Sequence, residues 1–289
     1  MEKIGIYTKI TPDDEIYPNQ LRKLRDMPKE LYCLGNLDIF KKRMVAVVGS
    51  RRTSSYGRWA AQNIAEKLAR ADVAVVSGMA RGIDTAAHKG ALNSEGSGKT
   101  IAVLGTGIDK CYPAENWKLK DMIAREGLVI SEYEPGVEGA RWRFPKRNRI
   151  ISGLCEMIIV CEAGLESGAL NTAEQALEMN KKVAAVPGNI NSAYCIGSNK
   201  LLQDNAMAIA VLDDVLSYID INGTIDFKHI DLSSGEMEIL NKIKGRGEVS
   251  IERLGDEMGK KPAEINGIIT VLEMKGVVCT SLGKVFVAK

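Results

Sequence analysis

Seven short apolar runs, rich in β-branched residues and separated by longer amphipathic segments, recur between residues 44 and 212. A strand that is apolar along its whole length must be covered on both faces, as happens when helices connect parallel strands. The alternation therefore predicts an α/β fold with a doubly wound, mainly parallel sheet. The runs are Met44–Val48, Val73–Val76, Ile101–Leu104, Leu128–Ile130, Met157–Cys161, Val183–Val186 and Ala208–Leu212.

At 289 residues the chain has room for about two domains. Residues 1–43 are mixed in character, with Leu21, Leu24 and Met27 at helical spacing, and we expect an N-terminal extension packed on the main domain. The main domain is predicted over 44–220. A polar segment without periodicity follows, which predicts a linker at 221–232 and a second domain over 233–289.

In doubly wound folds ligands bind beyond the carboxyl ends of the strands, so the residues after each apolar run are the candidates for function. Gly49-Ser50-Arg51-Arg52 follows the first run, and Gly164 to Gly168 follows the fifth. Glycine lets backbone NH groups approach a phosphate closely, and arginine offers a planar fork of donors. These loops predict contacts to phosphate.

Residues 141–149, here called the basic segment, hold five basic residues and no acid, with Trp142 and Phe144 between the charges. Aromatic rings beside guanidinium groups suit a polyanion whose bases are unstacked, which is single-stranded nucleic acid. We expect Arg141 to Phe144 to close a loop and present rings. Pro145 to Arg149 are expected to open a helix and direct donors at phosphate.

The pattern of helix and strand signals over residues 233–289 predicts a winged helix, with three helices and a two-stranded wing. Ser233 and Glu236 form a capping box for a helix over 234–244, and Pro262 begins the third helix. From 231 to 289 there are nine basic and nine acidic residues, and the third helix ends on Lys275 without an arginine. The charges therefore favour a protein-contact or structural role over sequence-specific duplex binding.

The overall charge limits the classes of partner. With 39 Lys and Arg against 37 Asp and Glu, the net charge of +2 gives no general attraction to nucleic acid or membrane, so binding must come from a local patch. The N-terminus does not resemble a signal peptide, and no apolar run is long enough to span a membrane. Six scattered cysteines without a CxxC pair indicate reduced thiols in a cytoplasmic protein, and two distant histidines give no sign of a metal site.

Cofactor and catalytic motifs are also missing. Gly96-Ser97-Gly98-Lys99-Thr100 lacks the first glycine of a phosphate-binding loop and precedes a strand instead of following one. The glycines at 105 and 107 lack the third member of a dinucleotide fingerprint. Ser77, Ser167, Glu162 and Glu166 lie at the predicted strand ends without a histidine triad, and we favour a structural role for Glu162. We expect no cofactor and no enzymatic activity.

The ordered motifs resemble the DNA-processing protein A family, also called Smf, over most of the chain. Some of its members carry an upstream helical domain, for which we expect no room here. The resemblance is carried by the segments Tyr17 through Gly35, Val47 to Arg51, Ser77 to Asp84, Phe144 to Leu154, Glu162-Ala163 with Ser167 to Leu170, Val186-Pro187-Gly188 and Gly197 to Leu202.

The resemblance implies an extended Rossmann-like domain, usually dimeric, that binds single-stranded DNA without sequence preference and helps to load a RecA-type recombinase during natural transformation. It also implies a winged-helix tail. Ala169 stands where the family usually has serine, so one hydroxyl contact is in doubt. By this resemblance and the loop analysis, the predicted DNA-binding residues are Arg51, Arg52, Phe144, Lys146, Arg147, Asn148, Arg149, Ser167, Gly168 and Lys200.

Two rival functions stay open at this stage. A nucleotide phosphoribohydrolase could use a similar sheet, although its Pro-Gly-Gly-x-Gly-Thr loop is reduced here to Pro187-Gly188-Asn189. A transcription regulator would act through the predicted winged helix.

Overall fold

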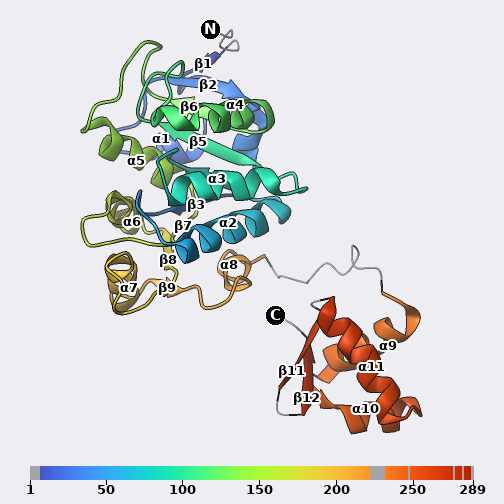
Figure 1. Cartoon of the computed structure of the whole chain (residues 1–289). Helices are drawn as coiled ribbons and strands as arrows, with labels where there is room; N and C mark the ends of the chain where they lie inside the picture. Colours follow the sequence, from blue (N-terminus) through green and yellow to red (C-terminus); the bar gives the residue numbers. More distant parts are fainter. Residues whose placement is uncertain (1–6, 222–231, 247, 276, 282, 288–289) are drawn as a thin grey trace. The chain divides into compact units, whose positions relative to one another are not determined.

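The computed structural model describes residues 7–221, 232–246, 248–275, 277–281 and 283–287. The chain divides into two compact units at Ile221. Figure 1 shows the two units, and each has a hydrophobic core of its own. The linker expected at 221–232 lies outside the described residues, apart from its two end positions.

The first unit contains a nine-stranded sheet. All pairs from β6 through to β9 are parallel, whereas β1 and β2 join the β6 edge as antiparallel strands. The predicted α/β fold is thereby confirmed, and the last predicted run forms only the short strand β9. In spatial order the strands are β1 (Thr8–Ile10), β2 (Leu31–Gly35), β6 (Leu128–Ser131), β5 (Thr100–Leu104), β4 (Ala74–Ser77), β3 (Met44–Val48), β7 (Met157–Val160), β8 (Lys182–Ala185) and β9 (Met207–Ala208).

The strand order places a topological switch point between β3 and β7. From β3 the chain builds outward through β4 and β5 to β6, and then returns to lay β7 against the free side of β3. The loops after β3 and β7 must therefore diverge in opposite directions and leave a crevice between them. In open α/β sheets this crevice is where ligands bind.

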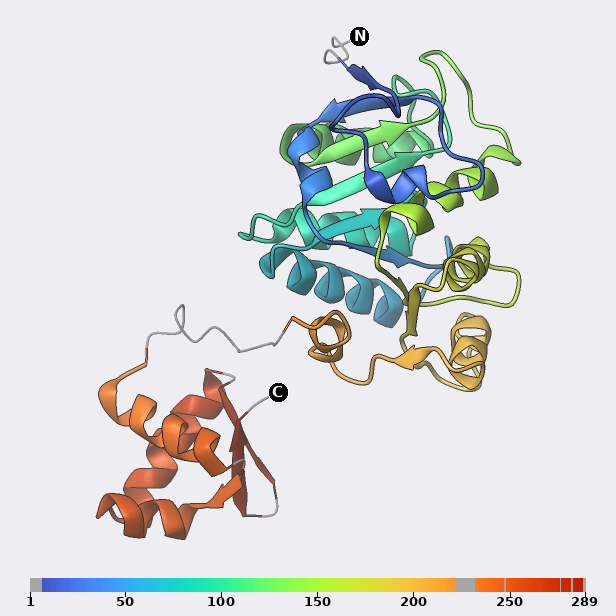
Figure 2. The ribbon, with the colours of Figure 1, turned by 180° about the vertical axis from the view of Figure 1, so that it is seen from behind.

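Helices cover both faces of the sheet (Figures 1 and 2). Along β3, Met44, Ala46 and Val48 contribute to one core, and Val45 and Val47 contribute to the other. This division explains why the strands are apolar at every position. On one face lie α1 (Asn19–Arg22), the 3₁₀ helix η1 (Leu37–Lys41), α5 (Arg143–Leu154), α6 (Gly168–Glu178) and α7 (Ile196–Gln203). On the other lie α2 (Ser55–Arg70), α3 (Ile83–Asn93), α4 (Trp117–Glu126), which follows the 3₁₀ helix η2 (Ala114–Asn116), and α8 (Asp214–Ser217).

The first 43 residues contribute more to the sheet than the sequence predicts. They supply β1 and β2, and their helical piece shrinks to the single turn α1. Leu21 of α1 is fully buried, and the Tyr17 hydroxyl donates to the carbonyl oxygen of Pro28 at 2.7 Å. β2 pairs with β6 through long-range contacts, which a local pattern does not reveal.

The described residues of the second unit form three helices and a three-stranded antiparallel sheet. Ser233 and Glu236 form the predicted capping box: the backbone NH of Ser233 donates to the Glu236 carboxylate at 2.6 Å. The strand β10, which pairs with β12, was not predicted. The elements are α9 (Ser234–Arg246), β10 (Glu248–Ser250), α10 (Ile251–Met258), α11 (Pro262–Met274), β11 (Val278–Ser281) and β12 (Lys284–Val287).

Among the helices in the described part of the chain, none combines the length and the apolar character needed to cross a membrane.

Candidate nucleic-acid interface

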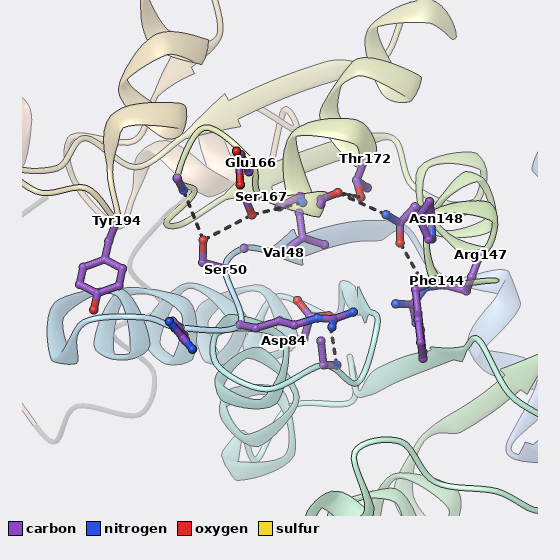
Figure 3. Close-up of a pocket in the computed structure, with 18 of the residues that line it drawn as sticks. Val48, Ser50, Asp84, Phe144, Arg147, Asn148, Glu166, Ser167, Thr172 and Tyr194 are labelled. Carbon is purple, nitrogen blue, oxygen red and sulfur yellow. Dashed lines mark hydrogen bonds between the residues drawn. The ribbon is translucent and has the colours of Figure 1, made fainter. Parts of the chain in front are cut away.

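A pocket of ≈ 740 Å³ opens at the switch point between β3 and β7. Its lining comes from segments that follow six of the parallel strands, which places it at the carboxyl edge of the sheet (Figure 3). We call it the switch-point pocket. Its lining includes the segments 48–52, 141–148 with gaps, and 164–169 with gaps, together with Ala80, Asp84, Tyr112, Thr172, Ala193 and Tyr194.

The loop after β3 is tied to the loop after β7. The backbone NH of Ser50 donates to the carbonyl oxygen of Glu162 at 2.7 Å, and the Ser50 hydroxyl lies 3.3 Å from that of Ser167 (Figure 3). Gly82, with φ +76°, lies so close to this loop that a Cβ atom would meet the carbonyl oxygen of Ser50 at 2.3 Å. These contacts fix the backbone from which Arg51 and Arg52 project.

Glu162 holds the start of α2. Its carboxylate is buried and accepts hydrogen bonds from the Thr53 hydroxyl, from the Ser54 hydroxyl and, at 2.9 Å, from the backbone NH of Ser54. Ser54 in turn caps α2 by accepting from the backbone NH of Gly57 at 2.9 Å. With three donors already on this carboxylate, the geometry supports the structural role favoured from the sequence.

Arg147 forms part of the pocket floor and is 4% exposed. Its guanidinium donates to the carbonyl oxygens of Gly78, at 2.6 Å, and Val103. The buried Asp84 carboxylate accepts from the backbone NH groups of Gly78 and Ala80 at 3.2 and 3.3 Å. Burial raises the pKa of Asp84 and lowers the pKa of Arg147 to about 10, which still leaves Arg147 charged at pH 7.

Phe144 lies half-buried in the pocket wall. Its ring is bounded by two glycines: a Cβ atom on Gly105 or Gly139 would meet the ring at 2.8 or 3.2 Å. The Tyr112 ring centroid lies 4.9 Å from that of Phe144, and the Arg51 guanidinium lies 5.4 Å from the Phe144 centroid. The pocket thus joins a cation to an aromatic pair in one surface, a combination that suits a base with its phosphate.

The exposed cations of the lining are Arg51, Arg52 and Arg141. None of them forms an ion pair with another residue in the described ranges. The two acids of the lining differ from each other, since Asp84 is buried beside Arg147 and Glu166 is exposed. The accessible charge of the pocket is therefore positive, which favours an anionic ligand.

The structure brings seven of the ten predicted site residues to this pocket. Arg51 and Arg52 are exposed there, and Ser167 and Gly168 form part of its wall. Asn148 donates to the carbonyl oxygen of Gly168 at 3.3 Å, so it positions that wall. The seven are Arg51, Arg52, Phe144, Arg147, Asn148, Ser167 and Gly168.

The other three predicted residues do not line the pocket. Arg149 is held by two acids: it donates to both carboxylate oxygens of Glu132, at 3.2 and 2.6 Å, and to Asp26 at 3.1 Å. Lys146 lies 3.9 Å from the same Asp26 carboxylate. Lys200 pairs with Asp204, the residue that caps the C-terminal end of α7, at 3.4 Å. Arg149 therefore differs from the expectation of a phosphate-facing fork, because its donors are used within the fold.

The basic segment also divides differently from the expectation. The helix α5 begins at Arg143, two residues before Pro145, so Phe144 belongs to its first turn and not to the preceding loop. Arg143 turns back on the loop, with its guanidinium 5.0 Å from the Trp142 ring centroid and 5.2 Å from that of Tyr133. Trp142 is 59% exposed but does not line the pocket.

Two rings of the pocket were missed by the sequence reasoning. Tyr112 and Tyr194 line it and are 48% and 46% exposed. Both lie in segments that follow parallel strands, β5 and β8, but further from the strand ends than the residues first considered. Extending the search along each loop to the next helix would have found them.

Neither a metal nor a nucleotide-loop site appears in the part of the chain that the structure describes. No three His, Cys, Asp or Glu side chains of those residues gather as metal ligands would. The segment Gly96 to Lys99 lies in the loop between α3 and β5, before the strand as predicted, with Gly98 packed against Val73.

The strand order and the pocket together define a Rossmann-like α/β protein with an arginine- and aromatic-lined pocket at its switch point. The chain belongs to the family of the DNA recombination-mediator protein A, whose model matches residues 8–220. It is 38% identical over 287 residues to a putative DNA processing protein DprA of Mycobacterium tuberculosis, covering 92% of this chain and 73% of that protein. It is 45% identical over 204 residues to the DNA processing protein DprA of Streptococcus pneumoniae, covering 71% of each.

Two solved structures share the fold of the first unit. The X-ray structure of DprA from Streptococcus pneumoniae has a TM-score of 0.70 and 43% identity, over 74% of each chain. The DNA processing protein A of Helicobacter pylori, described for its single-stranded DNA binding mode, has a TM-score of 0.68 and 30% identity, over 74% of this chain and 95% of that one.

Proposed function

We propose that this protein binds single-stranded DNA without sequence preference in the switch-point pocket. The observation that carries the proposal is the meeting of exposed Arg51, Arg52 and Arg141 with the rings of Phe144, Tyr112 and Tyr194 in one pocket. Arginines neutralise phosphates, and rings stack on any unpaired base, so neither contact depends on the sequence of the strand. The similarity to a Helicobacter pylori protein with a single-stranded DNA binding mode supports the same ligand.

The family membership supports a further step, in which the protein mediates recombination by loading a RecA-type recombinase onto the bound strand in the cytoplasm during natural transformation. Because the net charge is only +2, a single pocket attracts a DNA strand weakly. A homodimer would present two pockets to one strand, so that the second contact becomes intramolecular and raises the overall affinity. We therefore include a homodimer in the proposal.

The second unit is assigned a protein-contact role. The exposed face of α11 carries Glu264 and Glu273 and no arginine, which does not suit the major groove of a duplex. Removing residues 225–289 is expected to leave single-strand binding intact. Loss of that binding in the shortened protein would instead assign DNA contact to this unit.

A non-enzymatic mode of action fits the side chains of the pocket. Of the two acids in the lining, Asp84 is buried beside Arg147; Glu162, which does not line the pocket, is buried and accepts hydrogen bonds from Thr53 and Ser54. The rival phosphoribohydrolase function is tested by incubating the protein with nucleoside monophosphates and measuring release of the base. Turnover that disappears in Glu166→Gln would establish the enzyme and displace the binding proposal.

The direct test is a salt titration of binding to single-stranded and duplex oligonucleotides of equal length. If about three phosphates are neutralised, the logarithm of affinity should fall with the logarithm of salt concentration at a slope of about −2. Arg51→Ala and Arg141→Ala should weaken binding and flatten that slope. Lys118→Ala, which removes an exposed lysine from α4, is the control. Equal affinity for duplex, or wild-type slopes in both arginine variants, would overturn the proposal.

A further inference from the structure

A second pocket, of ≈ 480 Å³, lies in the groove between α2 and α3. We call it the helix groove. Arg58 and Gln62 line it from α2, and Thr85, Ala86 and Lys89 line it from α3. The two helices pack closely there: a Cβ atom on Gly90 would meet the carbonyl oxygen of Gln62 at 2.1 Å. The groove is therefore a rigid surface, held by backbone contact between its walls.

The charge of the helix groove is entirely positive. Its lining contains Arg51, Arg52, Arg58 and Lys89 and no Asp or Glu. The Arg58 guanidinium is oriented by bonds to the carbonyl oxygen of Thr53, at 2.8 Å, and to the Ser55 hydroxyl, at 3.2 Å. Both of these acceptors are neutral, so the Arg58 charge is not balanced by them. Lys89 is exposed and forms no ion pair with any residue of the described ranges.

The helix groove is continuous with the switch-point pocket. Arg51, Arg52 and Tyr194 line both. Gly82, which also lines the groove, holds the backbone at Ser50 and Arg51 in place through its close approach. A ligand that leaves the switch-point pocket past Arg52 thus meets a ring and then two further cations, without passing an acidic side chain of the groove lining.

We propose that the helix groove is a second phosphate-binding site for the same DNA strand, which continues from the switch-point pocket past Arg52 and Tyr194 and over Arg58 and Lys89. This inference rests on the proposed function and deepens it. A free phosphate or a single nucleotide would neutralise only one or two of these cations. A polyanion is the ligand that uses all four along one continuous surface.

The proposal predicts that the groove matters only for strands long enough to reach it. Binding is measured for oligothymidylates of about 4 and about 16 nucleotides, the two ends of the range for compact single-strand sites. The wild-type protein should bind the longer strand more tightly and with a steeper salt dependence. In Arg58→Ala/Lys89→Ala, affinity for the longer strand should fall roughly tenfold, and the salt slope should flatten by about 1.4, which is about 0.7 for each lost phosphate contact. Affinity for the shorter strand should stay at the wild-type value.

Two further variants make the result decisive. Lys89→Ala alone removes one exposed cation and leaves the Arg58 contacts intact, so it controls for a folding defect in the double variant. It should show about half of the change in salt slope that the double variant shows. Lys118→Ala removes a lysine from α4 and should change neither strand's binding. A wild-type affinity and slope for the longer strand in both groove variants would overturn this inference and leave the proposed function standing. If the wild-type protein bound neither strand, the proposed function itself would fail.

Discussion

The guanidinium of Arg147 donates to the carbonyl oxygen of Gly78 at 2.6 Å, and this bond joins α5 to the loop after β4. The contact is close, because a Cβ atom on Gly78 would meet the Arg147 Nη2 atom at 2.4 Å. Arg147 belongs to the basic segment, yet its charge is directed into the fold and not toward a ligand. Its effect on a bound strand must therefore act through the shape of the pocket floor.

Replacing Arg147 with methionine should lower the free energy of unfolding of the first unit by about 3 to 5 kcal/mol, because buried Asp84 loses its cationic neighbour and two carbonyl groups lose their donor. Urea unfolding followed by tryptophan fluorescence measures this unit alone, since Trp59, Trp117 and Trp142 all lie in it. Arg141→Met is the control and should change stability by less than about 0.5 kcal/mol. Unchanged stability in Arg147→Met together with a flatter salt slope would restore the phosphate-contact role predicted from the sequence.

Arg52→Ala should reduce single-strand affinity without reducing stability. The side chain is exposed, lines both pockets and forms no ion pair with another described residue. Losing one phosphate contact should flatten the salt slope by about 0.7. Fluorescence-anisotropy titrations at several salt concentrations measure both the single-strand affinity and the salt slope. Arg125→Ala, an exposed arginine on α4 paired with Asp121, serves as the control and should keep the wild-type slope.

The pocket rings should contribute to binding in a way that salt does not alter. Tyr112→Leu and Tyr194→Leu each remove a ring that is about half exposed in the pocket, and each should cost about 1 to 3 kcal/mol of binding free energy at every salt concentration. Trp142→Leu removes a more exposed ring outside the pocket and should cost nothing measurable. Should Trp142→Leu be the variant that weakens binding, the strand would run over the basic segment and not through the pocket.

The fold class could be predicted because it leaves a pattern among residues that are close together in the sequence. The alternation of apolar runs with amphipathic segments is forced by a parallel sheet with two covered faces, and six of the seven predicted runs correspond closely to strands β3 to β8. The strand order is not local. Nothing in the sequence near Met157 says that β7 lies beside β3, and only that pairing puts the switch point between the loops of Ser50 and Ser167.

The site was predictable in part for the same reason. Arg51, Ser167 and Phe144 were found because they lie near strand ends or in a dense aromatic and basic run. The partners of Arg147 and Arg149 come from elements distant in sequence: Gly78 and Val103 for the first, Asp26 and Glu132 for the second. A charge pattern records which side chains are basic, but it does not record which of them the fold has already paired.

Gly82→Ala should displace the loop after β3, although Gly82 does not itself line the switch-point pocket. Gly82 adopts φ +76°, and a Cβ atom there would collide with the carbonyl oxygens of Ser50 and Arg51, so the loop after β3 must shift. We expect a loss of stability of about 1 to 3 kcal/mol and weaker single-strand binding. Gly136→Ala is the matched control outside the pocket lining, because Gly136 also has a positive φ, +89°, but a Cβ atom there would meet no atom within 4 Å. Equal behaviour of the two variants would show that the position of the Ser50 loop does not govern binding.

His88 should make the stability of the first unit sensitive to acid. The Thr100 hydroxyl donates to the carbonyl oxygen of Val75 at 2.7 Å, so it must accept from His88 Nδ1, also at 2.7 Å, and the buried Nε2 atom has no hydrogen-bond partner in the described structure. Burial, together with the nearby charge of Arg147, lowers the pKa of His88 from 6.5 to about 3.

Between these two values the unfolded chain binds a proton at His88 that the folded protein does not bind, so stability rises with pH and is lost as the pH falls below 6.5. His88→Gln keeps a donor for the Thr100 hydroxyl but does not titrate. Between pH 7 and pH 5 the wild-type protein should therefore lose about 2 kcal/mol more stability than this variant, as measured by urea unfolding with tryptophan fluorescence. An equal loss in both proteins would mean that the His88 ring accepts a proton within the folded unit. Protonation would keep the Nδ1–H bond to the Thr100 hydroxyl and add an NH at Nε2, which has no hydrogen-bond partner in the described structure and would need a new acceptor.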